Sequence, residues 1–230
     1  MSNTINIDFL IVGQGIAGTV LAHQLIDRNK SVHIIDNGHV SSSSHIAGGV
    51  THPMSFKRII LSWKADMLIP FAKEFYRSFE AQFNNKVFYN LPMNRVFSSV
   101  EEQNNWQGRM ADYPMNEIIG DTDIDLSGFE LNAPFGTGKV NLAGRLDVRK
   151  FINLSKKHFE DRKIISSSNF DFSQLKIKEN AISYGNINAK QIVFCEGYKF
   201  TENPYFNYIP LSPTKGEILI IKTNELPTQF

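Results

Sequence analysis

Cysteine is almost missing from this chain of 230 residues, which contains only Cys195. One cysteine excludes an intrachain disulfide and a metal site built from thiolates alone, and the six histidines show no metal-ligand spacing. We therefore expect no metal site. The chain also lacks an apolar run long enough to cross a bilayer, and it lacks a basic segment ahead of the first apolar run. These absences predict no integral membrane segment and, by default, a cytoplasmic protein.

Charge of one sign is not in excess either. Lysine and arginine number 24 against 23 acidic residues, for a net charge of +1, and the basic residues are scattered along the chain. This balance gives no reason to expect a nucleic-acid partner. A Gly-x-Ser-x-Gly nucleophile elbow is absent, which argues against a serine hydrolase. The 42% hydrophobic content is ordinary for one large domain or two small ones.

The strongest positive signal is a glycine-rich turn between an apolar strand and a helix. Residues 9–12 are continuously apolar and run into Gly13-x-Gly15-x-x-Gly18. An amphipathic helix follows, and a second apolar strand over residues 32–35 ends on Asp36. This order is the βαβ dinucleotide-binding fingerprint. The alternative interpretation is an ordinary βαβ unit whose glycine turn binds nothing.

Each part of the fingerprint has a physical role. Gly13 permits the tight turn, Gly15 lets a pyrophosphate approach the backbone, and Gly18 lets the helix pack close to the strand. Ile16 and Ala17 begin the helix, whose N-terminus offers free N–H groups to phosphate oxygens. Asp36 can accept hydrogen bonds from a ribose diol, which argues against the 2′-phosphate of NADP.

The segment after Asp36 is rich in glycine, serine and histidine over residues 37–55. Such a run is typical of a flexible linker. Here it leads directly into Ala47-Gly48-Gly49-Val50, whose small residues suit close packing of backbone on a ligand. We favour a ligand-binding loop, and this loop also favours FAD over NAD, since NAD-only domains continue straight into the next βα unit.

The rest of the chain shows alternating helix and strand patterns without an internal repeat. Apolar spacing predicts helices over residues 60–83, divided or kinked at Pro70, over 101–119 with a break near Pro114, and from about 147 to 158. Strands are expected within 86–100 and 120–144, from Ile164, as a hairpin over 175–184, over 190–197 and over 215–221.

With these segments in order, the chain resembles the FAD-dependent oxidoreductases of the D-amino-acid oxidase and glycine oxidase family. Four stretches carry the resemblance: Gly13 through Asp36; Ser43-Ser44-x-x-Ala47-Gly48-Gly49-Val50; Val193-Phe194-Cys195-Glu196-Gly197-Tyr198; and Pro210-Leu211-x-Pro213-x-Lys215-Gly216-Glu217. The third is similar to a family strand that ends in Ala-Thr-Gly-Ala, with Cys195 and Glu196 in place of alanine and threonine. The fourth is similar to the family's Pro-x-Arg-Gly-Gln stretch.

The resemblance implies bound FAD and a set of residues that would hold it. The pyrophosphate would lie at Gly13, Gly15, Ile16, Ala17 and Gly18, with Gly197 beside it, and the adenosine would lie at Asp36, Asn37 and Phe170. Ser43 and Ser44 would reach the pyrophosphate or the ribityl chain, and Gly48, Gly49 and Val50 would place backbone near the flavin ring.

The implied fold is α/β. A Rossmann-like FAD/NAD(P)-binding domain would be built discontinuously from residues 1–58 and 145–205. A substrate domain of mostly antiparallel sheet with helices would come from residues 59–144 and 206–230. Family members continue beyond the point that corresponds to the end of this chain, so the chain resembles a C-terminally truncated member.

The implied activity is oxidation of a small amine or amino acid by hydride transfer to flavin N5, with oxygen or another compound as electron acceptor. Two alternatives remain open: oxidation of a hydroxy acid or another non-amine substrate, and a non-catalytic dinucleotide-binding fragment. The sequence identifies no catalytic residue. His52 and Arg58 are candidates for the substrate pocket, and Arg95 and Arg145 are further candidates for binding a carboxylate, although each of them is more often a structural residue.

Overall fold

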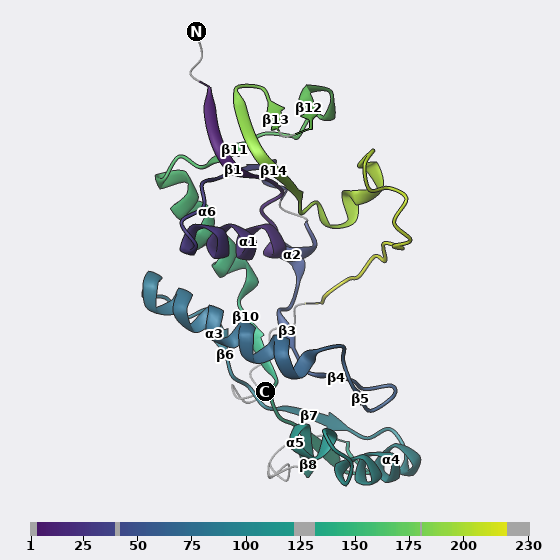
Figure 1. Cartoon of the computed structure of the whole chain (residues 1–230). Helices are drawn as coiled ribbons and strands as arrows, with labels where there is room; N and C mark the ends of the chain where they lie inside the picture. The colour runs from purple at the N-terminus through teal and green to yellow at the C-terminus, as the bar shows by residue number, and fades with distance from the viewer. Residues whose placement is uncertain (1–3, 40–41, 122–131, 180, 220–230) are drawn as a thin grey trace. The chain divides into compact units, whose positions relative to one another are not determined.

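A computed structural model describes residues 4–39, 42–121, 132–179 and 181–219 (Figure 1). Among these, residues 4–47 and 148–218 form one compact unit, and residues 48–147 form a second. The boundaries differ from the expected ones at three places, one of which puts residues 145–147 in the second unit. Residues 48–58 belong to the second unit, where β3 (Val50–Thr51) pairs with β10 (Gly144–Leu146). Residues 206–218 belong to the first unit, where Phe206 packs on Phe194.

The first unit contains a sheet of six strands in the order β11-β2-β1-β14-β13-β12. Its strands are β1 (Ile5–Val12), β2 (Val32–Asp36), β11 (Ile165–Ser167), β12 (Leu175–Lys178), β13 (Ala181–Tyr184) and β14 (Ile187–Phe194). Strands β1, β2, β11 and β14 are parallel, and the hairpin of β12 and β13 extends the sheet in the antiparallel sense. The carboxyl ends of β1, β2 and β14 therefore meet at one edge, where open α/β sheets bind ligands.

Two helices pack on one face of this sheet, α1 (Ile16–Asp27) and α6 (Val148–Asp161) (Figure 1). Ile11 and Ile34 of the sheet join Ala22 of α1 and Phe159 of α6 in a fully buried cluster. Because side chains alternate along a strand, Leu10 and Ile35 face the other side, where they join a second cluster with Ile187.

Helix α1 is terminated by a left-handed residue, Asn29. Asn29 adopts a left-handed conformation with φ 57°, and the N–H groups of Asn29 and Lys30 bond to the carbonyls of Ile26 and Leu25 at 2.9 and 3.0 Å. This is a Schellman C-cap, in which asparagine takes the usual place of glycine. It turns the chain into β2 and so positions Asp36 at the far end of that strand.

The second unit consists of small antiparallel sheets and helices. The sheets are β3-β10-β6, β4-β5 and β7-β9-β8. The remaining strands are β4 (Met54–Ser55), β5 (Ile60–Leu61), β6 (Phe88–Tyr89), β7 (Met93–Val96), β8 (Ile119–Asp121) and β9 (Thr137–Val140). The helices are α3 (Ala65–Phe83), α4 (Val100–Met110) and α5 (Met115–Ile118). Trp106 is the largest fully buried side chain, and it packs among Phe97, Met115 and Val140.

Two predicted elements differ from the structure. Pro70 does not divide α3, which runs unbroken from Ala65 to Phe83. Proline removes only one intrahelical hydrogen bond, and the apolar face of the helix is buried on either side of it by Ile69, Phe75 and Phe79. Residues 215–219 are not a strand, since they have no ladder partner among the described residues. The predicted run continues to residue 221, and residues 220–221 lie outside the described part.

No helix in the described part of the chain is long and apolar enough to span a membrane. The described residues also contain no group of three or more histidine, cysteine, aspartate or glutamate side chains that could hold a metal ion.

Candidate functional site

The turn from β1 into α1 is built so tightly that only glycine fits at two positions. Gly13 has φ +99°, and a Cβ at this position would overlap the carbonyl oxygen of Cys195 at the end of β14. A Cβ at Gly18 would overlap the carbonyl oxygen of Gly13. The backbones of β1, β14 and the first turn of α1 are therefore in direct contact, and the turn is fixed at the edge of the sheet.

The N-terminus of α1 is capped from a distant part of the first unit. Gly15 is the N-cap residue and has no side chain to offer. The hydroxyl oxygen of Ser44, in α2 (Ser43–Ile46), accepts a hydrogen bond from the backbone N–H of Ile16 at 3.0 Å. The first four N–H groups of a helix lack intrahelical acceptors, and the helix dipole adds positive potential there. This end of α1 therefore suits an anion.

Asp36 organises the loop at the end of β2. One carboxylate oxygen accepts a hydrogen bond from the backbone N–H of Gln14 at 2.8 Å, and the other accepts one from Gly38 at 2.7 Å. Each carboxylate oxygen has a second lone pair, so Asp36 can still accept hydrogen bonds from a hydroxyl-bearing ligand. Asp36 thus links the end of β2 to the glycine turn between β1 and α1.

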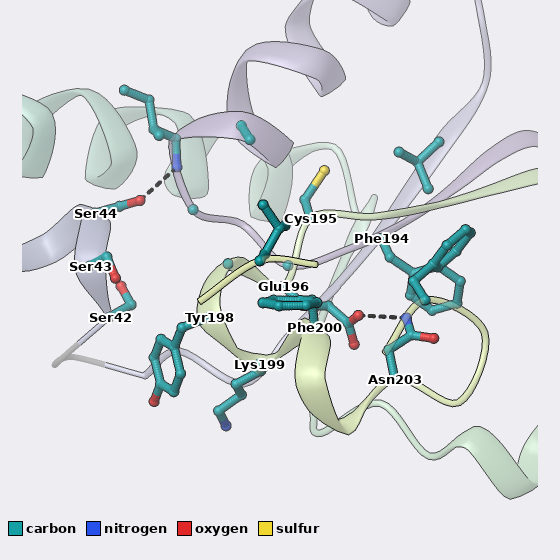
Figure 2. Close-up of a pocket in the computed structure, with 18 of the residues that line it drawn as sticks. Ser42, Ser43, Ser44, Phe194, Cys195, Glu196, Tyr198, Lys199, Phe200 and Asn203 are labelled. Atoms are coloured by element: carbon teal, nitrogen blue, oxygen red, sulfur yellow. Dashed lines mark hydrogen bonds between the residues drawn. The ribbon is translucent and has the colours of Figure 1, made fainter. Parts of the chain in front are cut away.

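A cavity of about 760 Å³ lies beside the glycine turn in the first unit (Figure 2). Its lining comes from the start of α1, the loop and helix around α2, the end of β14, and η2 (Gly197–Glu202) with the segment after it. Of the residues singled out by the sequence, it brings together Gly13, Gly15, Ile16, Ala17, Ser43, Ser44 and Gly197.

A smaller cavity of about 280 Å³ is also lined by Gly13 of the same glycine turn. Asp36, Asn37 and Phe170 line it, as the resemblance implied that they would lie together at one end of a ligand. Three residues line both cavities: Gly13, Glu196 and Lys199. The two cavities therefore adjoin at the edge where β1, β2 and β14 end.

Glu196 is held in place by a fully buried amide. The Nδ2 group of Asn203, with 0% of the residue exposed, donates a hydrogen bond of 2.7 Å to a carboxylate oxygen of Glu196 (Figure 2). The Oδ1 atom of Asn203 in turn accepts from the backbone N–H of Tyr205 at 2.9 Å. Burial raises the pKa of Glu196 above its ordinary value, and the nearby Glu202 adds to that effect.

Aromatic rings form a wall close to both cavities. Phe194, the last residue of β14, packs on Phe170, Phe172, Tyr205 and Phe206 with ring centroids 5.7 to 6.3 Å apart. Phe170 in turn stacks on Tyr184 at 4.5 Å. This cluster fixes the loop that carries Phe170 against the end of β14, and thereby shapes the smaller cavity.

The remaining sequence candidates belong to the second unit. Gly48, Gly49 and Val50 run along β10, where the carbonyl of Gly49 accepts from the N–H of Leu146 at 2.9 Å and that of Gly48 accepts from the Nε–H of Arg145 at 3.4 Å. Their predicted place beside a flavin ring stays a prediction.

His52 does not line the polar cavity that Arg58 lines in the second unit. His52 packs on Phe56 with ring centroids 4.9 Å apart, and its buried Nδ1 atom has no hydrogen-bond partner among the described residues. Arg58 is exposed and lines a polar cavity of about 450 Å³ with Lys57, Asn104 and Arg109, among others. Arg95 is paired with Glu102 at 2.8 Å.

The sequence reasoning missed several residues of the first-unit cavities. Lys199 and Asn203 carried no motif, and Glu196 was visible only as an acid where the resembling family has threonine. The segment from Phe206 to Leu211 was assigned to a substrate domain, whereas Phe206, Ile209 and Leu211 line the larger cavity. The signal that could have found them is their position directly after a strand that ends at a glycine.

Comparison with protein families identifies this arrangement. The model of the DAO family, described as FAD dependent oxidoreductase, matches residues 8–229. The chain belongs to this family of FAD-dependent oxidoreductases. Its DAO-family fold is consistent with a parallel core sheet in the first unit and antiparallel sheets in the second.

Solved structures share the fold of this DAO-family chain at low sequence identity. An L-proline dehydrogenase from P. horikoshii aligns with a TM-score of 0.68 at 12% identity, covering 91% of this chain and 57% of that one. An L-amino acid deaminase from Proteus vulgaris aligns with a TM-score of 0.60 at 18% identity, covering 82% and 47%. An L-alpha-glycerophosphate oxidase from Mycoplasma pneumoniae, with FAD bound, aligns with a TM-score of 0.56 at 16% identity, covering 87% and 56%. The chain thus spans about half the length of these proteins.

Proposed function

We propose that this chain is the FAD-binding part of an oxidoreductase that acts on a small amine or amino acid. The observation that carries the proposal is the pair of adjoining cavities at the carboxyl ends of β1, β2 and β14, joined at Gly13. A long ligand with an anionic middle fits this arrangement, because the N-terminus of α1 lies at the larger cavity and Asp36 lines the smaller.

The residues present fit FAD. Asp36, Asn37 and Phe170 would hold the adenosine, since they provide a carboxylate, an amide and an aromatic ring around one cavity. The lack of a side chain at Gly15 leaves backbone open to the diphosphate, and an added Cβ there would lie 3.1 Å from the hydroxyl of Ser44. Ser44 would share the helix N-terminus with the diphosphate or ribityl chain.

When bound, FAD supplies the redox chemistry by accepting a hydride from the substrate carbon. The protein then needs to orient the substrate C–H bond and exclude water from it. For the substrate side we propose residues of the second unit. The buried Nδ1 of His52 has no hydrogen-bond partner among the described residues, and Arg58 with Lys57 provides positive charge for a carboxylate in a cavity that His52 does not line.

The substrate class is supported by relatives and not by identified contacts. Two of the three similar structures named above act on amino acids, according to their names. The third is a glycerophosphate oxidase, which supports a hydroxyl-bearing substrate as the second candidate.

The proposal is tested by absorbance spectroscopy of the purified chain. We expect flavin bands that shift when FAD is added, and no comparable response to NAD. Anaerobic addition of amino acids, and separately of hydroxy acids and glycerol phosphate, would then bleach the flavin bands for the correct class. A chain that leaves the spectrum and fluorescence of FAD unchanged would contradict the proposed cofactor site, whereas bleaching by hydroxy compounds alone would contradict the amine substrate.

A further inference from the structure

Glu196 is an acidic residue at the proposed dinucleotide site, where a negative charge has no evident role in binding. It follows Cys195 at the end of β14 and lines both first-unit cavities together with Gly13. The backbone nitrogen of Glu196 lies 3.6 Å from the position that a Cβ on Gly13 would take. A ligand whose diphosphate lies at the Gly13 turn would therefore bring negative charge close to this side chain.

A hydrogen bond holds the carboxyl group of Glu196, so this side chain does not rotate freely at the surface. Asn203 is completely buried and donates to one oxygen of Glu196 at 2.7 Å, while its own carbonyl oxygen is held by Tyr205. In Figure 2 the carboxyl group of Glu196 is turned toward Asn203, and the side chain of Lys199 extends in another direction. No ion pair joins these two side chains among the described residues, although the charge of Lys199 and the hydrogen bond from Asn203 both favour the charged form of Glu196.

A charged carboxylate next to a diphosphate is repelled, whereas a protonated carboxyl group can donate a hydrogen bond to an anionic oxygen. Half-burial of the side chain favours the neutral form in the same direction. We propose that Glu196 takes up a proton when the dinucleotide binds, so that FAD affinity in this protein falls as pH rises. This inference rests on the proposed FAD site and goes beyond it.

Other titratable groups face the same region and must be separated from Glu196. Lys199 and Glu202 come from η2, Cys195 from the end of β14, and Asp36 and His39 from the segment that ends and follows β2. Glu202 is the matched control, because it carries the same charge and lines the smaller cavity, yet it is exposed and does not line the larger one.

The test compares FAD dissociation constants from pH 5.5 to 8.5 for the 230-residue chain, Glu196→Gln and Glu202→Gln, measured by flavin fluorescence. A single linked proton weakens binding by up to about tenfold for each pH unit between the pKa of the group in the free protein and its higher pKa in the complex. We expect this slope in the unmodified chain and in Glu202→Gln. In Glu196→Gln, which keeps an oxygen that can accept from Asn203 and is neutral at every pH, we expect a flat profile, and FAD binding at pH 8 tighter than in the unmodified chain by the factor that the unmodified chain loses between pH 5.5 and pH 8.

A second measurement needs no variant. Calorimetric titration of the unmodified chain with FAD at pH 7.5, in two buffers of different ionisation enthalpy, would show net proton uptake. A slope retained in Glu196→Gln, or binding without proton uptake by the unmodified chain, would overturn the role of Glu196 and leave the FAD site standing. Failure of the unmodified chain to bind FAD at any pH would remove the FAD site and this inference together.

Discussion

Ser44 and Ile16 meet at the N-terminus of α1, where the serine hydroxyl accepts the backbone N–H of Ile16 at 3.0 Å. The N-cap residue, Gly15, has to lack a side chain if backbone is to remain open to a ligand, and it therefore cannot cap its own helix. Ser44 supplies the missing acceptor from α2. The loop after β2 and the glycine turn are thus coupled by one hydrogen bond.

Replacing Ser44 with alanine should therefore destabilise the unliganded protein. Loss of a side-chain cap costs about 1 kcal/mol, and we expect the free energy of unfolding in urea to fall by about this amount. Ser43→Ala is the matched control, since Ser43 is exposed and has no described side-chain hydrogen bond. Equal effects of the two substitutions would show that the contact with Ile16 contributes nothing.

Gly18 and Gly108 should respond in opposite ways to alanine. A methyl group at Gly18 would overlap the backbone oxygen of Gly13, which cannot rotate away, so we expect Gly18→Ala to cost about 3 kcal/mol of unfolding free energy. Gly108 lies in α4 with nothing within 4 Å of an added Cβ, and alanine there should stabilise by about 0.5–1 kcal/mol. Urea titration of both variants checks this. A mild effect at Gly18 would mean that α1 can move off the sheet.

The first 36 residues could be interpreted from sequence because each feature there is local. The apolar strands and the glycine turn are fixed by neighbours within a few positions, and the structure has both. The hairpin of β12 and β13 was predicted for the same reason. In such segments, backbone geometry alone restricts which residues fit.

The parts that sequence could not predict depend on contacts between distant segments. Residues 215–219 have the composition of a strand, but a strand exists only with a partner, and none is described for them. The capping of α1 by Ser44 joins positions 28 residues apart, and the hydrogen bond between Glu196 and Asn203, only seven residues apart, belongs to no motif. Phe206 was expected in a substrate domain, and its packing on Phe194 is a tertiary contact that the sequence pattern does not indicate.

Asp36→Asn should weaken FAD binding more than it weakens the fold. The amide keeps one acceptor oxygen for the N–H of Gln14 or of Gly38, and it loses the other together with the charge that attracts ribose hydroxyls. We expect the dissociation constant for FAD to rise ten- to a hundredfold at pH 7, as measured by flavin fluorescence. Asp27→Asn, at the end of α1, changes the same charge and should leave affinity unchanged. An unaltered affinity of Asp36→Asn would contradict the placement of the ribose there.

Buried histidines should make the protein less stable in mild acid. Burial lowers the pKa of His23 to about 4, with His158 and Arg162 adding to the effect. Its ring hydrogen-bonds the hydroxyl of Ser155 at 2.9 Å within the α1–α6 contact. An unfolded histidine has a pKa near 6.5, so the unfolded state binds more protons as pH falls through the range from about 6.5 to about 4. Folding stability contributed by neutral His23 is therefore complete above pH 6.5 and lost toward pH 4.

Urea unfolding between pH 7.5 and 4.5 measures this loss of stability. For His23 the loss between pH 6.5 and pH 4 amounts to about 3 kcal/mol. His33 and His158 also have pKa values lowered by burial and will add to the slope. His23→Gln keeps a polar group for Ser155 and cannot take up the proton, so its stability should depend less steeply on pH than that of the parent chain. His39→Gln, at an exposed position, should keep the parent slope. If both variants keep it, the acid sensitivity arises from carboxylates and not from the helix contact around His23.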